Sequence, residues 1–218
     1  MTVRTNSGLQ MFMESAIASP VTITGITLAN PGVVSATAHG YSNGDIVLVE
    51  CLGMLQINGR LFKVVSQATD SFRLAGPDGA TGIDTTNYTA FTSGTVKKVT
   101  LGTTITGCMD FNAAGGDIKT VDTTTVHDTQ DTEIVVGATA QSYDMTVQWD
   151  PSAAAQQAMK AAFIARANKA FKIRWPDGAY ILFYGTVGYT GAPGGGKQGV
   201  TSSPAKISML NSLTEYAA

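Results

Sequence analysis

The run that most clearly suggests a chemical function is GAPGGGKQ, at residues 191–198. It comes close to the loop in which backbone amides and a lysine hold the phosphates of a nucleotide. That loop needs Ser or Thr after the lysine to hold magnesium, whereas this chain has Gln198. It also needs a helix whose N-terminus faces the phosphates, and residues 199–204 include a glycine and a proline that disfavour a helix. We therefore interpret the run as a flexible hairpin tip.

Other residues with catalytic or metal-binding chemistry are few and scattered. None of the two histidines and two cysteines lies in a pattern typical of a nucleophile–base pair or a zinc site. A lone histidine before a glycine, such as His39, is typical of a satisfied turn or core residue. The residues Asp128, Asp131 and Glu133 lack the spacing of a calcium loop. We expect no catalytic residues, no bound metal and no cofactor, so the sequence disfavours an enzyme.

The composition indicates a β protein that buries part of its surface against other molecules. Hydrophobic residues make up 44% of the chain and charged residues only 14%, which is low for a soluble monomer. The alternative explanation for the low charge is a solvent-exposed surface rich in Thr, Ser, Gly and Ala. The net charge of -2 disfavours tight nucleic-acid binding. The sequence has no apolar run of membrane-spanning length and no secretion signal, so we expect the chain to stay in the cytoplasm where it is made.

The clearest structural pattern covers residues 141–178 and predicts strand, helix, strand and turn. Apolar and polar residues alternate from Tyr143 to Trp149, which is typical of a half-buried strand. Asp150 followed by Pro151 is typical of a helix start. The helix is predicted over about 151–169, and it is the only long helix that the sequence predicts. The expected fold class is therefore mainly β, a sandwich or barrel with one α-helix.

Positions within the predicted helix separate a core side from an outer side. Met159 and Phe163 recur at helical spacing, so we expect both to pack in the core. Ile164 lies on the otherwise polar side and is predicted to make a subunit or domain contact. The following strand, 179–189, is apolar on both faces. We expect it to lie between the sheet core and the helix.

Residues 21–98 differ in character from the rest of the chain. Four short β segments are separated by glycine turns, which predicts a small barrel. The residues AHG at 38–40, NGD at 43–45 and ING at 57–59 resemble the small β-barrel first described in ubiquitin-activating enzymes, which recurs in phage structural proteins. The resemblance implies no ubiquitin chemistry. Five basic and five acidic side chains give the segment no charge that would identify a partner.

The remaining sequence resembles the phage tail tube proteins. The resemblance covers about 99–218 and rests on TGCMDF at 106–111, a strand ending in WDP, an Ala- and Gln-rich helix, and a strand ending in WPDG. It implies a β-sandwich or barrel tail-tube fold, and subunits whose hexameric rings stack into the conduit for DNA delivery. The partners that it implies are copies of the chain, the tail tip or terminator protein, the tape measure protein and passing DNA. It also implies a place in the virion tail, after synthesis in the cytoplasm of the bacterial host.

These resemblances predict a discontinuous organisation. Residues 1–20 and 99–218 would form the tail-tube domain, and 21–98 an inserted barrel at an exposed loop, dispensable for assembly. The alternative function is a phage-associated binding or decoration module that uses 21–98 to contact a receptor or carbohydrate. Its few candidate surface aromatics are Tyr41, Phe72, Tyr88 and Phe91.

Residues 115–137 are the most polar part of the chain and are predicted to form a hairpin. The resemblance implies an assembly arm that reaches towards neighbouring subunits; a flexible surface hairpin is the alternative. Its charged or titratable residues are Asp117, Lys119, Asp122, His127, Asp128, Asp131 and Glu133.

A conduit for DNA must not hold its cargo, because each cation facing the lumen would recruit a phosphate. We therefore expect neutral or acidic side chains on the wall. The predicted lumen residues are Asp144, Thr146 and Gln148, which share one face of a strand. Lys172 and Arg174 are expected to face away from the lumen. The alternative is that these polar faces meet bulk solvent.

Overall fold

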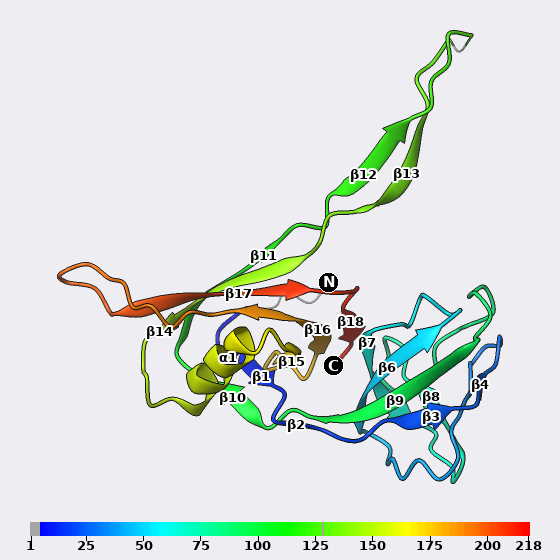
Figure 1. Cartoon of the computed structure of the whole chain (residues 1–218), viewed down its shortest axis with the longest axis horizontal. Coiled ribbons are helices and arrows are strands. Elements are labelled where there is room, and N and C mark those ends of the chain that lie inside the picture. Colours follow the sequence, from blue (N-terminus) through cyan, green and yellow to red (C-terminus); the bar gives the residue numbers. More distant parts are fainter. Residues whose placement is uncertain (1–4, 128) are drawn as a thin grey trace.

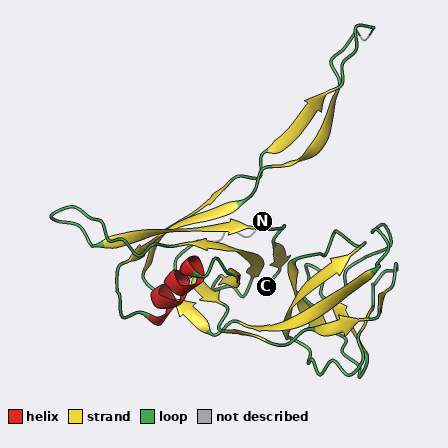
Figure 2. Cartoon of the chain, viewed as in Figure 1, coloured by secondary structure: helices red, strands yellow, loops and turns green. Residues whose placement is uncertain are grey.

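The computed structural model describes residues 5–127 and 129–218. Antiparallel strands form two eight-stranded sheets and a separate two-stranded ribbon (Figure 1). The described residues contain one α-helix, which packs on the first sheet (Figure 2). The mainly β fold with one helix that the sequence predicts is confirmed.

The first sheet is built from strands that are far apart in the sequence. In spatial order they are β10 (Thr103–Ile105), β1 (Gln10–Met13), β15 (Asn168–Arg174), β16 (Tyr180–Gly188), β17 (Ser202–Met209), β14 (Ser142–Gln148) and β11 (Cys108–Ala114), with β18 (Thr214–Tyr216) also paired to β16. The two edge strands, β10 and β11, follow each other directly in the chain. The sheet therefore wraps around its inner face.

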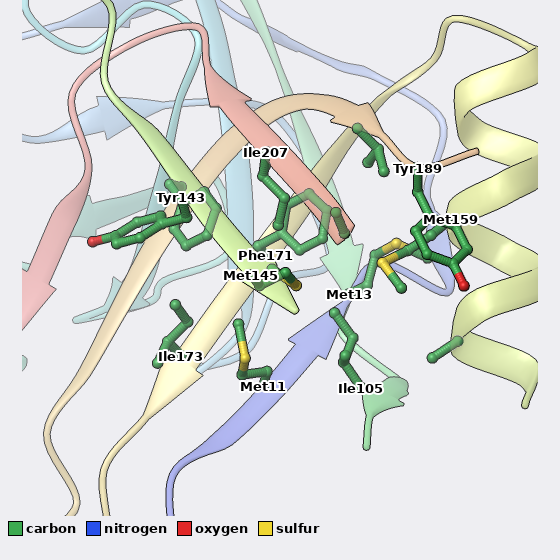
Figure 3. Packing of buried hydrophobic residues seen from close by; sticks show 14 of the residues in the cluster. Met11, Met13, Ile105, Tyr143, Met145, Met159, Phe171, Ile173, Tyr189 and Ile207 are labelled. Carbon is green, nitrogen blue, oxygen red and sulfur yellow. The ribbon is translucent and has the colours of Figure 1, made fainter. Parts of the chain in front are cut away.

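The inner face of the first sheet holds a core of methionine, aromatic and branched side chains (Figure 3). In β14 the buried residues Tyr143, Met145 and Val147 alternate with more exposed ones, as the period of two predicts. The Tyr143 ring lies 5.0 Å from that of Phe183, and Phe183 stacks on Phe171 at 5.4 Å. These contacts join β14, β16 and β15 through one packed layer.

The helix α1 (Ala154–Ile164) is shorter than the predicted span of 151–169. Asp150 does not cap it; its carboxylate accepts hydrogen bonds from the backbone N–H and the hydroxyl of Ser152, at 2.9 and 2.6 Å, in a turn before the helix. At the other end Arg166 takes a positive φ of 51°, which ends the helix. The chain then enters β15, so Lys169 belongs to a strand.

The two predicted core positions of α1 differ in the structure. Met159 is completely buried, but Phe163 is 41% exposed, so the prediction for Phe163 is wrong. Four residues turn a helix by about 400°, so Phe163 lies about 40° further round than Met159. It also lies in the last turn, where its side chain lines an open groove with Val187 of β16.

A buried polar residue that the sequence analysis did not single out fixes the helix to the sheet. The Gln156 side chain donates to the carbonyl of Gln148 at 2.6 Å. Its amide oxygen accepts from the Tyr189 hydroxyl at 2.7 Å and from the N–H of Asp150 at 3.1 Å. Because Gln156 is only 5% exposed, these bonds satisfy polar atoms that would otherwise be costly to bury.

The second sheet has the order β2 (Ala16–Ile17), β9 (Ser93–Thr100), β6 (Ile46–Leu52), β7 (Arg60–Val65), β8 (Ser71–Leu74), β5 (Val34–Ser35) and β4 (Gly25–Ile26), with β3 (Val21–Ile23) also paired to β9. Strands β3 and β4 are consecutive parts of one segment and pair with opposite ends of the sheet. The sheet thus closes around a core that includes Val47, Phe62 and Phe72.

The two sheets pack against each other through a third apolar cluster. Leu48, Leu61 and Val65 of the second sheet meet Leu182 and Tyr216 of the first. The Tyr216 hydroxyl accepts from the N–H of Lys63 at 2.8 Å. Arg60 of β7 also contacts the segment before β18, because its guanidinium donates to the carbonyl of Leu213 at 3.0 Å.

This packing shows that β16, predicted at 179–189 to lie between the sheet core and the helix, has a different layer on one side. One face of β16, with Ile181, Phe183 and Val187, belongs to the core that α1 covers. The opposite face, with Leu182, is covered by the second sheet. The strand is buried on both sides as expected, but the second layer is not the one that the sequence analysis assigned.

Candidate functional site

A two-stranded arm extends from the end of the first sheet. Strands β12 (Ile118–Asp122) and β13 (Glu133–Ala138) form a ribbon that projects into solvent (Figure 1). The predicted arm residues that the structure describes are all exposed: Asp117, Lys119, Asp122, His127, Asp131 and Glu133. Asp128 lies outside the described residues. The hairpin predicted for 115–137 is thus present.

The arm is less polar on its surface than the sequence analysis expected. Six large apolar side chains, between 50% and 97% exposed, lie along it: Ile118, Val121, Val126, Ile134, Val135 and Val136. The ribbon leaves them exposed because no segment that the structure describes covers either of its faces. The run of branched residues in 134–136 was the sequence signal for this surface.

The three predicted lumen residues lie together on the outer face of β14. Asp144, Thr146 and Gln148 alternate with the buried core residues of this strand. Asp144 forms an ion pair with Lys206 of β17, at 3.4 Å between carboxylate oxygen and amine nitrogen. The third apolar cluster, through which the two sheets pack, contains no described residue of β14, β17 or β11. This half of the first sheet therefore presents a polar face that the second sheet leaves open.

Lys172 lies on the half of the sheet that packs towards the second sheet. Its amine nitrogen is 4.4 Å from the centre of the Tyr180 ring. Burial lowers the pKa of Lys172 below its usual range, and the positive charges of Arg174 and Lys63 lower it further.

A groove lies where the C-terminal end of α1 meets β16 and β17. It has a volume of about 600 Å³ and is lined by apolar Phe163, Ile164 and Val187 together with the cations Arg166 and Lys206. Ile164 is 71% exposed, so within a single subunit its side chain is largely in contact with water.

The residues considered for metal or phosphate chemistry have structural surroundings. The His39 ring is buried; its Nε2 lies 2.9 Å from the Ala68 carbonyl, and its Nδ1 accepts from the N–H of Tyr41 at 3.0 Å. Among the described residues there is no cluster of three or more His, Cys, Asp and Glu that could hold a metal ion. The run at 191–198 leads into strand β17 and not into a helix.

No described helix is both long enough and apolar enough to cross a membrane.

Two of the four candidate surface aromatics are in fact core residues. Tyr41 is 5% exposed and Phe72 is completely buried, so neither can contact a receptor or carbohydrate. Tyr88 and Phe91 are partly exposed. This correction removes half of the aromatic residues on which the alternative binding function depended.

Comparison with known proteins identifies the family. The sequence pattern of the phage tail tube protein family (TTP) matches residues 53–218. The chain also resembles a solved structure, the tail of an empty GTA particle determined by helical refinement with C6 symmetry. That match has 17% sequence identity and a TM-score of 0.40, and it covers 52% of this chain and 85% of the other. A search of curated proteins finds no match. Because the family pattern spans most of its length, the chain belongs to the phage tail tube protein family and is a structural component of the virion tail.

Proposed function

We propose that the chain assembles with copies of itself into stacked rings, six subunits in each as in the tail tubes that it resembles, and that the channel through the rings conducts DNA. The observation that carries this proposal is the arm, whose apolar side chains are left exposed by all the described residues of one subunit. Exposed apolar groups of this kind are expected to be buried on association.

Electron microscopy of the purified protein tests the proposed assembly. We expect rings or tubes, because a subunit with such an arm gains from burying it against a copy. A protein that stays dispersed at every concentration and binds glycans instead would contradict the proposal and favour the alternative binding module.

We further propose that the open polar face of β14 lines the channel. The three residues on this face, Asp144, Thr146 and Gln148, are acidic or neutral. The nearby cation Lys206 is paired with Asp144. Such a wall neither attracts phosphates strongly nor offers apolar surface to the bases. The half-buried position of Lys172 beside Tyr180 fits the same arrangement, because it holds that cation away from the polar face.

Replacing Thr146 with Lys tests the lumen assignment. We expect tubes to form but DNA delivery to fall by about tenfold or more, because a ring of added cations would bind passing phosphates. The readout is the titre of phage particles that carry the variant. The matched control is Thr22→Lys on the exposed surface of β3. Equal titres for both variants would contradict the assignment.

We also propose the discontinuous organisation of the chain, with the second-sheet segment inserted into the tube domain. Strands β1 and β10 pair with each other, and the second-sheet strands all fall between them in the sequence. We propose boundaries near residues 15 and 101 instead of 20 and 99, because β2 pairs with β9. The family match begins at residue 53, within this segment, so the family pattern includes part of it.

Partners beyond the chain itself follow from a place in the tail. We infer contacts with the tail tip or terminator protein at the tube ends and with the tape measure protein in the lumen. The family is a structural one, and we infer that the subunit works without catalysis.

A further inference from the structure

One face of the arm combines acidic and apolar side chains. Asp122 and Glu133 are directly opposite each other in the ribbon, and the next pair on the same face is Thr120 and Val135. Like charges in directly opposed positions destabilise a strand pair. No ion pair involving Asp122 or Glu133 occurs within the described parts of the chain. This acidic arm face therefore lacks the cations that would relieve the repulsion.

The groove at the end of α1 has the opposite charge and also exposes apolar side chains. Phe163 and Ile164 expose 41% and 71% of their surface beside Val187. Arg166 stands at the same groove without an ion pair in the part of the chain that the structure describes. Lys206 also lines the groove, but it is paired with Asp144, so Arg166 is the cation left for a partner.

We propose that the acidic arm face of one subunit docks into the α1 groove of a neighbouring copy. Val135 would cover Phe163 and Ile164, and the carboxylates of Asp122 and Glu133 would pair with Arg166. This pairing relieves the repulsion between the two opposed carboxylates and covers apolar surface on both partners, so each surface supplies what the other lacks. The inference rests on the proposed self-assembly and identifies the surface that receives the arm.

The placement of the two surfaces fits a repeating assembly. In Figure 1 the arm projects away from the body of the molecule, whereas α1 lies on the body against the first sheet. A contact between two different surfaces of identical subunits is head-to-tail, and its repetition gives a closed ring or an open helical array. Repeated in one direction around an axis, the contact gives rings or tubes, and the proposed assembly uses it in this way.

A charge swap tests the contact. Glu133→Lys and Arg166→Glu should each reduce the assembled fraction by about tenfold, because each places like charges across the contact. The double variant should recover assembly, since it restores opposite charges at every interface. Asp117→Lys and Lys160→Glu are matched controls, because they make the same charge changes at the base of the arm, out of alternation with Thr120 and Asp122, and on α1 outside the groove. A double variant no better than either single one, or controls that lose as much, would overturn the inference.

A disulfide test separates this inference from the proposed function. When Val135→Cys and Ile164→Cys chains are mixed and oxidised, a dimer linked between these positions is expected. Ile134→Cys is the matched control, because its side chain points to the opposite face of the ribbon. All three positions are exposed, so unchanged thermal unfolding verifies that the variants fold. Wild-type tubes without the Val135–Ile164 link would overturn the docking site and leave tube assembly standing; the link without tubes would support the docking site and count against the proposed tube.

Discussion

Replacing residues 21–98 with a short Gly-Ser linker is expected to give a chain that aggregates before it can assemble. The deletion would uncover Ala170, Leu182 and Tyr216, which are at most 3% exposed beneath the second sheet. It would also remove the N–H of Lys63 that the Tyr216 hydroxyl accepts from. A newly exposed apolar patch of this kind favours association without order. Static light scattering of the purified chain measures the effect.

A compensated deletion distinguishes a covering role from an essential one. Adding Leu182→Thr and Tyr216→Thr to the same deletion is expected to restore a soluble subunit, because the uncovered face then carries hydroxyl groups. If the segment is dispensable for assembly, this chain should form tubes that lack an outer layer of density. A plain deletion that stays soluble and assembles normally would show that the covered face needs no protection.

Met159→Ala is expected to destabilise the subunit by about 2–5 kcal/mol, because it removes a completely buried side chain from the first-sheet core. Phe163→Ala is the matched comparison on the same helix. We expect it to lower the free energy of unfolding by less than Met159→Ala, although it removes a larger side chain, because Phe163 is 41% exposed. Denaturant unfolding of the unassembled protein measures both. A larger loss for Phe163→Ala would contradict the position that the structure gives it.

Local patterns in the sequence were sufficient to predict much of the first sheet. Alternation from Tyr143 to Trp149 predicted β14, and helical spacing predicted a helix after it. These predictions succeed because a period of two or 3.6 reports directly which residues share a face. The helix ends were less accurate. Asp150 has the chemistry of a cap, but its carboxylate binds Ser152 in a turn, and a backbone turn at Arg166 ends the helix early.

The sequence by itself determined that 179–189 is buried on both faces and that Asp144, Thr146 and Gln148 share a polar one. Only the tertiary structure decided what covers each face. The second sheet packs on Leu182, Phe163 is partly exposed at the end of α1, and the arm keeps its valines and isoleucines exposed. The physical reason is that periodicity records whether a side chain avoids water but not which distant segment excludes it. That choice depends on long-range packing, and no part of the chain within 5–127 and 129–218 covers the arm.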